Sequence, residues 1–250
     1  MLDKFWDKIG EDIAEQWNIK TFSMSLLFWG IGLFLFLSQI GWKQSKDLFD
    51  VLGINPIIGG VILISLLIIV IAFEKFVEWC ARPFLKFLEG YWPNIIRERM
   101  MVFELIRHSK LKDKFTELSC KNEKSLMDEQ EIAQVEYNLY YQFPEESAIL
   151  PTGIGNILKS AEEYPLKMYG LESVITWPHL WLVLPENTRQ ELGIARQQLY
   201  ESIQLILWGI LFGIWVVFTW WAPVIGILIA FAGLYRAQSD AATFGVLFRS

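Results

Sequence analysis

Long uncharged, strongly apolar runs dominate the hydrophobic pattern of this chain. They occupy Thr21–Gly41, Val51–Phe73 and Leu205–Tyr235. The first run has 21 residues, which as an α-helix would measure about 31 Å at 1.5 Å per residue. The hydrocarbon core of a bilayer is about 30 Å thick. These runs therefore predict transmembrane helices.

The third run has 31 residues, too many for one untilted span, and it contains Pro223. Proline lacks a backbone N–H and clashes with the preceding helical turn. We therefore expect a hairpin with one span over Leu205–Trp221, a tight turn at Ala222-Pro223 and a return span from Val224.

The return span is short, because the uncharged part from Val224 to Tyr235 measures only about 18 Å as a helix. We expect it to continue as helix through Arg236 and Asp240 toward Leu247. Arg236 and Asp240, four residues apart, then form either an interfacial pair or a buried functional pair. A re-entrant half-helix is the alternative for this segment.

The middle of the chain, residues 74–204, is polar and mostly helical in its pattern. The expected helices are 74–89 with a stop at 90–93, 94–121, 126–141, 153–163 with Thr152 as its cap and Tyr164-Pro165 as its end, and 188–204 from a capping box at Thr188 and Glu191. No convincing alternating strand is present. We therefore expect an all-α domain here.

Together these segments predict an all-α fold with four transmembrane helices in two hairpins and a mostly helical cytoplasmic domain inserted between spans 2 and 3. The expected divisions are an amphipathic N-terminal arm (1–20), transmembrane helices 1 and 2 (21–73), the helical cytoplasmic domain (74–204), transmembrane helices 3 and 4 (205–241) and a cytoplasmic helical tail (242–250).

The N-terminal arm has apolar residues at every fourth position, from Phe5 through Ile9 and Ile13 to Trp17, which is typical of an amphipathic helix. It also carries five acids, the wrong charge for the start of a cleaved signal peptide. Anionic lipid attracts such a helix only when its polar face is basic. We therefore expect the arm to pack on protein.

Composition and charge narrow the class of protein. The 250 residues are 53% apolar and 20% charged, with a net charge of −6, and this argues against a disordered chain and a nucleic-acid binder. Two cysteines cannot form a disulfide framework, and the two histidines, His108 and His179, are solitary. We expect no metal site, no cofactor and no nucleic-acid partner.

The distribution of lysine and arginine predicts the orientation. All but three of the 22 basic residues lie in the arm, in residues 74–204 or in the tail. The exceptions are Arg236, at the end of the fourth span next to the tail, and Lys43 and Lys46 in the link between spans 1 and 2. An even number of spans places these three regions on one side, and the positive-inside rule makes that side cytoplasmic. Both termini are therefore expected in the cytoplasm.

The segment 150–185 is dense in proline, glycine, tryptophan and tyrosine. Its pattern is Leu150-Pro151-Thr152, Gly155-Asn156, Ala161-Glu162, Tyr164-Pro165, Tyr169-Gly170, Trp177-Pro178, Trp181 and Leu184-Pro185, with a second motif at 88–93 (LEGYWP). The combination resembles an uncharacterised family of bacterial multi-span membrane proteins. The resemblance implies the span layout and a bacterial inner-membrane location. It also implies that the last helix continues past Phe248, and it supplies no activity or catalytic residue.

Catalytic motifs are not evident. Gly153 and Gly155 could open a dinucleotide-binding motif, but Leu158 stands where the third glycine belongs, so a tight helix start is expected instead. There is no P-loop, no G-x-S-x-G and no H-E-x-x-H motif. We therefore expect no enzyme activity. The polar and aromatic candidates for a partner-binding site are Asn156, Glu162, Tyr169, Trp177 and Trp181.

Two small-residue patterns predict close helix packing: Gly209-x-x-x-Gly213 and Gly226-x-x-x-Ala230. These faces pack either on each other or on a second subunit. Substituting Gly209 or Gly213 by a branched residue is expected to disrupt the packing.

The function predicted from these observations is that of a non-catalytic, oligomerising membrane scaffold or effector with a cytoplasmic partner-binding domain. Its partners are the bilayer, further copies of itself and an unidentified cytoplasmic protein or small ligand. The alternative is an oligomeric channel or transporter, with Asn55-Pro56 and Gly59-Gly60 as the break in a discontinuous helix. The absence of ionisable residues from the expected spans favours the scaffold, and a membrane enzyme ranks third.

Overall fold

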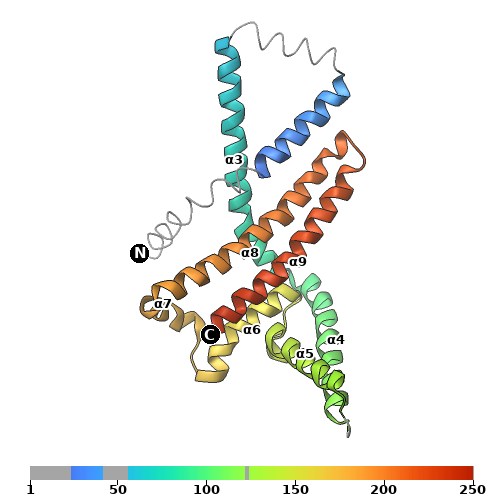
Figure 1. Cartoon of the computed structure of the whole chain (residues 1–250), viewed down its shortest axis with the longest axis vertical. Helices are drawn as coiled ribbons and strands as arrows, with labels where there is room; N and C mark the ends of the chain where they lie inside the picture. Colours follow the sequence, from blue (N-terminus) through green and yellow to red (C-terminus); the bar gives the residue numbers. More distant parts are fainter. Residues whose placement is uncertain (1–23, 42–55, 122–123, 250) are drawn as a thin grey trace. The chain divides into compact units, whose positions relative to one another are not determined.

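The computed structural model describes residues 24–41, 56–121 and 124–249, and these contain helices and connecting turns but no β-strand. The all-α prediction is therefore confirmed for the described residues. The N-terminal arm and the link at 42–50 lie outside them. Along the chain the helices are Met24–Ile40, α3 (Pro56–Leu88), α4 (Asn94–Ser119), α5 (Leu126–Gln142), η1 (Glu146–Ala148), α6 (Gly153–Tyr169), α7 (Ser173–Val183), α8 (Glu186–Phe212), η2 (Gly213–Val217) and α9 (Ala222–Arg249) (Figure 1).

Within the described residues, three helical segments are long and apolar enough to cross a membrane: Ile58–Leu88, Glu186–Val217 and Ala222–Arg249. Met24–Ile40 is a shorter apolar helix, and the residues expected to begin its span, 21–23, lie outside the described part. The prediction of a membrane protein is supported at this level.

The chain divides into two compact units. Unit 1 consists of Met1–Cys80 and Gln204–Phe231, and unit 2 consists of Ala81–Ile203 and Ala232–Ser250. The helices α3, α8 and α9 each contribute residues to both units. Each unit has its own packed interior.

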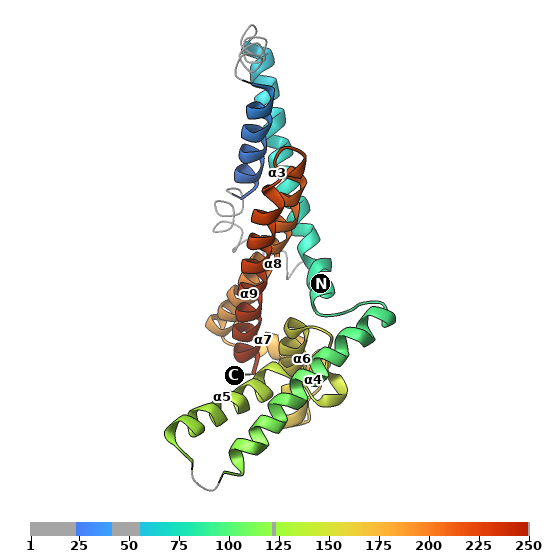
Figure 2. The ribbon, with the colours of Figure 1, turned by 90° about the vertical axis from the view of Figure 1, so that its right-hand side faces the viewer.

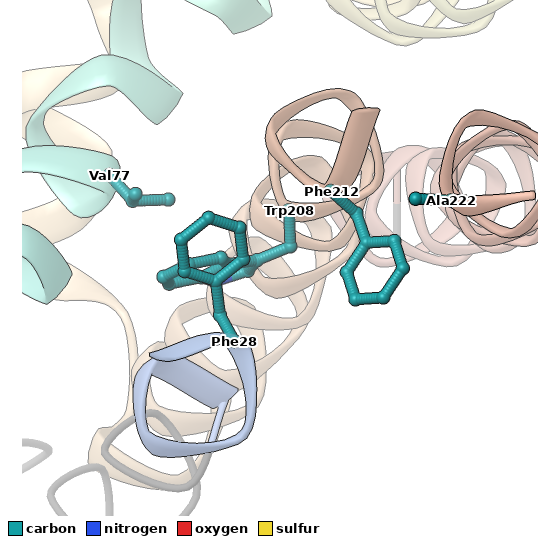
Figure 3. Close-up of a cluster of buried hydrophobic side chains, with 5 residues drawn as sticks. All are labelled: Phe28, Val77, Trp208, Phe212 and Ala222. Atoms are coloured by element: carbon teal, nitrogen blue, oxygen red, sulfur yellow. The ribbon is translucent and has the colours of Figure 1, made fainter. Parts of the chain in front are cut away.

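The core of unit 1 is a cluster of aromatic and small side chains, Phe28, Val77, Trp208, Phe212 and Ala222. Figure 3 shows Phe28, Val77 and Trp208 directed toward one another from three different helices. The Phe28 ring lies 5.4 Å from the Trp208 ring and stacks on Phe73 at 5.7 Å. Aromatic pairs at such distances add attraction beyond the burial of their area. Ring packing therefore holds together helices that are far apart in sequence.

The second hairpin differs from its prediction at the turn. The chain leaves helix at 218–221, and α9 begins at Ala222, so the prediction of a turn at Ala222-Pro223 is wrong by a few residues. Pro223 lies in the first turn of α9, where its missing N–H removes no intrahelical bond. The helix then runs without a break to Arg249, which confirms the predicted continuation through Arg236 and Asp240.

The first long helix also corrects a prediction. Asn55 lies outside the described residues, but Gly59 and Gly60 are both inside α3, so no helix break occurs at the glycine pair. Glycine permits a break but does not impose one. The helix continues past Pro83, ends at Leu88 and is followed by Gly90 at φ +93°. The predicted stop at 90–93 is confirmed.

Unit 2 is built from short helices packed in chain order, α4 on α5, α5 on α6 and α6 on α7. Figure 2 shows α4 and α5 side by side as an antiparallel pair. The prediction that Tyr164-Pro165 ends α6 is wrong. The helix passes through Pro165 to Tyr169 and stops at Gly170, whose left-handed backbone (φ +68°) suits glycine. The helix α8 begins at Glu186, two residues before the predicted Thr188.

The first turn of α5 is closed by a reciprocal capping box. The Asp128 N–H donates to Ser125 Oγ at 3.2 Å, and the Ser125 N–H donates to Asp128 Oδ2 at 3.0 Å. Lys121 Nζ lies 2.6 Å from Asp128 Oδ1. The hydrogen bond from Lys121, followed by those from Ser125, holds the pKa of the Asp128 carboxyl well below its ordinary value.

This arrangement makes the start of α5 sensitive to acid. A carboxyl with a depressed folded pKa adds stability above its unfolded value of about 3.9, and that stability is lost as the pH falls toward the folded value. We expect the protection of the amides in the first turn of α5, measured relative to their intrinsic exchange rate at each pH, to fall in acid. At neutral pH their exchange should quicken in Asp128→Ala but not in the neighbouring Glu129→Ala. Hydrogen exchange detected by mass spectrometry measures both variants. Equal amide exchange rates in Asp128→Ala and Glu129→Ala would contradict the prediction.

Candidate interaction surface

The N-terminus of α6 is anchored to the chain that follows α3. Thr152 caps α6: its Oγ accepts the Gly155 N–H at 3.0 Å and donates to the Leu88 carbonyl at 2.5 Å. A Cβ at Gly155 would lie less than 3 Å from the Glu89 backbone carbonyl. Only glycine allows the two backbones to approach this closely. The predicted cap at Thr152 is confirmed.

The same contact brings together two motifs of the sequence, 88–93 and the start of 150–185. At Gly90 a Cβ would collide with the ring of Pro151. Segments 88–93 and 150–156 are therefore in contact in unit 2, although about sixty residues separate them. The glycine, proline and threonine residues of both motifs have a packing role here.

Asn156 lies inside unit 2 and is 0% exposed. Its Oδ1 accepts the Leu150 N–H at 2.6 Å, and its Nδ2 donates to Glu104 Oε2 at 3.2 Å. The side chain thereby ties the segment before α6 to α4. This position gives Asn156 a tethering role within the unit and no exposed surface.

Glu162 is half-buried on α6. Its carboxylate lies 3.2 Å from Lys159 Nζ, and its backbone carbonyl accepts the Ser173 Oγ–H at 2.5 Å, which links α6 to α7. The Glu162 carboxylate interacts electrostatically with the carboxyl of Glu89. Burial raises the pKa of Glu89, Lys86 opposes the rise and Glu162 adds to it.

Trp177 and Trp181 share one face of α7, as predicted, with ring centroids 5.8 Å apart. Trp181 is buried, and Trp177 is half-buried and stacks on Phe248 of α9 at 4.4 Å. Both indoles are thus used in packing within unit 2. The tryptophans of segment 150–185 are therefore explained largely by packing inside unit 2.

A continuous stretch of chain nearby exposes large apolar side chains. We call this set the α6–α7 surface. Tyr169 is 66% exposed and Val183 is 83% exposed. The members are Leu166, Met168, Tyr169, Leu171, Ile175, Leu180, Leu182 and Val183. Of these the sequence analysis found only Tyr169, because α7 is apolar on all sides and its pattern does not show which side faces outward.

The last described residue, Arg249, is held by α5 and α6, and the sequence pattern does not reveal this. Its Nη2 donates to Ser160 Oγ at 2.8 Å and to the Tyr141 carbonyl at 3.3 Å. The guanidinium carbon lies 4.6 Å from the centre of the Tyr141 ring, with Tyr140 at 5.7 Å and Tyr164 at 6.0 Å. The end of α9 is therefore fixed to unit 2 by charge-assisted and cation–π contacts.

Removing this guanidinium should loosen the end of α9. We expect Arg249→Ala to lower the unfolding free energy of unit 2 by about 2 kcal/mol, since a desolvated cation–π contact and two hydrogen bonds are lost. Arg249→Lys should recover less than half, because an ammonium lacks the planar fork. Chemical unfolding of the full chain measures this, with the exposed Arg99→Ala as control. Equal effects of Arg249→Ala and Arg99→Ala would contradict it.

In unit 1 the small-residue faces of α8 and α9 pack on each other. A Cβ at Gly209 would lie 2.5 Å from the Ala230 nitrogen and 2.7 Å from the Gly226 carbonyl oxygen. One at Gly226 would lie 2.5 Å from the Gly209 carbonyl oxygen and 3.3 Å from the Gly213 nitrogen. A Cβ at Gly213 itself would meet nothing within 4 Å. The close approach is therefore made within the hairpin, and it excludes a side chain at Gly209 but not at Gly213.

A polar network joins α8 and α9 in unit 2. Arg236 Nη2 lies 3.4 Å from Glu201 Oε2, and its Nε lies 3.5 Å from Asp240 Oδ2. Ser202 Oγ donates to the same Asp240 carboxylate. The Arg236–Asp240 pairing is confirmed as part of an interhelical network.

The described residues contain no group of three histidine, cysteine or acidic side chains placed to hold a metal ion. A groove of about 450 Å³ runs along α4 and α5, but none of the sequence-predicted site residues line it. Its basic residues Arg107 and Lys114 pair with Glu104 and Glu131 respectively. No family model, curated protein or solved structure matches the chain. The functional argument therefore rests on the described geometry.

Proposed function

We propose that this chain is a bacterial inner-membrane protein with four transmembrane helices that acts as a non-catalytic scaffold. Three long apolar helices and the shorter Met24–Ile40 support the span count. The lysine and arginine distribution supports a cytoplasmic location for both termini and for residues 74–204.

The observation that carries the scaffold proposal is the α6–α7 surface. Its large apolar side chains remain exposed in a unit whose indoles are already packed. Large apolar side chains gathered and exposed in one region of a folded unit are typical of protein interaction sites. Tyrosine, which is enriched at the centre of such sites, is present at Tyr169.

The partner we assign to this surface is a second copy of the chain, since most oligomers are symmetric homo-oligomers that use the same patch on each subunit. Leu182 and Val183, adjacent at the end of α7, are both largely exposed and would lie at the centre of such a contact.

Photo-crosslinking in intact cells tests this. A photoreactive phenylalanine analogue replaces Val183 in one variant and the exposed, charged Glu129 of α5 in the control variant. We expect a product of twice the chain mass from position 183 and none from position 129. A product of another mass at 183 would assign a different protein partner. The scaffold proposal fails if position 183 gives no more product than position 129.

One observation favours the second candidate, an oligomeric channel or transporter. The uncharged runs that predict the spans contain no charged residue, but the apolar segment Ile58–Leu88 extends past its run and includes Glu74. This residue is buried in unit 1. Buried ionisable residues in membrane helices commonly mark ion or proton sites.

A further inference from the structure

Glu74 is the one ionisable side chain among the described residues that is buried, at 6% exposed. Neither carboxyl oxygen has a hydrogen-bond partner in the part of the chain that the structure describes. The residue directly follows the uncharged run that ends at Phe73. A charged carboxylate in such a place is costly unless something neutralises it.

The surroundings of Glu74 come from two helices of unit 1. Ser25 of the helix Met24–Ile40 is fully buried and donates through Oγ to the Val70 carbonyl, one turn before Glu74, at 3.0 Å. The Ser25 amide lies near the carboxylate, outside hydrogen-bond geometry. Phe73, next to Glu74, stacks on Phe28 at 5.7 Å. Glu74 therefore lies at the edge of the aromatic core.

Among the described residues, no cation pairs with this carboxylate. The charged groups near it are Lys75 and Glu78, both on its own helix. Lys75 is largely exposed and bonds Glu78 Oε2 at 2.8 Å. The described residues of Met24–Ile40 and the unit 1 parts of α8 and α9 carry no charged side chain. The described part of the chain also offers no ligand set for a metal ion.

Other polar atoms inside unit 1 are likewise without partners. The indole nitrogens of Trp29, Trp208 and Trp215, the Gln204 amide nitrogen and the Thr219 hydroxyl are buried and make no hydrogen bond within the described residues. Gln204 and Trp208 lie four residues apart on one side of α8, and Trp215 follows in η2. Unpartnered buried polar groups in proteins call for an explanation such as a bound water or ion.

We propose that Glu74 is a proton-binding site of unit 1. A proton neutralises the carboxyl without needing the several oxygen ligands that a metal cation requires. The carboxyl is neutral in the packed state seen here. It ionises when the contact between Met24–Ile40 and α3 opens. This inference does not depend on the α6–α7 surface, so either proposal can fail without the other.

The test uses a lipophilic carbodiimide, which reacts with protonated carboxyls in apolar surroundings. The full-length chain is reconstituted in neutral phospholipid vesicles, labelled, and mapped by mass spectrometry. We expect label on Glu74 and not on Glu78. Labelling should persist in Glu78→Gln, disappear in Glu74→Gln, and fall about tenfold per pH unit once the carboxyl ionises.

Each alternative outcome overturns the proposal. Equal labelling of Glu74 and Glu78 would show that Glu74 is an ordinary accessible acid. Absence of label on Glu74 at every pH would show that it holds no exchangeable proton. Protection of Glu74 by added Na⁺ at constant pH would assign the site to a metal cation. Because the wild-type chain reports both positions at once, the test holds even if Glu74→Gln does not fold.

Discussion

Gly209→Leu should strongly destabilise unit 1, whereas Gly213→Leu should leave it nearly unchanged. At Gly209 a Cβ already lies 2.5 Å from the Ala230 backbone nitrogen, and backbone cannot move aside as a flexible side chain can. Overpacking of this kind costs about 3 kcal/mol. In a chain of this size that lowers the thermal midpoint by roughly 6–12 °C.

Gly213→Leu is the matched control, since the same side chain is added four residues later in open space. Thermal unfolding of the full chain in detergent, followed by tryptophan emission, measures both variants. The sequence pattern predicts that substitution of either glycine disrupts the packing, whereas the structure predicts this for Gly209 alone. Equal losses at the two positions, or none at Gly209, would contradict the packing of α8 on α9.

Asn156→Leu is expected to cost unit 2 about 3 kcal/mol. The change removes two hydrogen bonds: the Leu150 N–H loses its acceptor, and the Glu104 carboxylate keeps only its contact with Arg107. Stranding buried polar groups costs more than the bonds themselves contribute. Chemical unfolding of the full chain, monitored by near-UV circular dichroism, measures the loss.

Glu162→Gln is the control for this change, because its contact with Lys159 is partly exposed and contributes about 0.5 kcal/mol at most. If Asn156→Leu were as stable as Glu162→Gln, the tethering role would be wrong. If Asn156→Leu were as stable as the wild-type chain but no longer bound a partner protein, the prediction from the sequence that Asn156 is a binding residue would be supported instead.

Periodicity and capping chemistry predict most of the helices. The pattern places α4 and α5 within about two residues of their bounds, and Thr152 is recognised as a cap because its chemistry is local. Likewise, the spacing of four residues between Arg236 and Asp240 predicts a pair on one face of a helix that continues past the apolar segment, and the structure contains this pair. Such features depend only on nearby residues.

The remaining features depend on partners distant in sequence or on context. Pro165 and Pro223 indicate breaks by local rules, yet both are accommodated inside helices. Arg249 forms a hydrogen bond with Ser160, which is 89 residues away in the sequence, and no sequence pattern predicts that contact. Glu74 stands one residue past the uncharged run that predicts the second span. Its burial depends on another helix that packs against it, and the local pattern does not show this.

The central claim is a membrane protein with its helical insertion in the cytoplasm, and site-directed labelling tests it most directly. Cys80 and Cys120 are first replaced by serine, and single cysteines are introduced as Ser45→Cys and Lys124→Cys. A membrane-impermeant maleimide is then applied to intact spheroplasts. We expect label at position 45 in sealed spheroplasts, and at position 124 only after the membrane is opened. Label at 124 in sealed spheroplasts, with position 45 protected, would contradict the account.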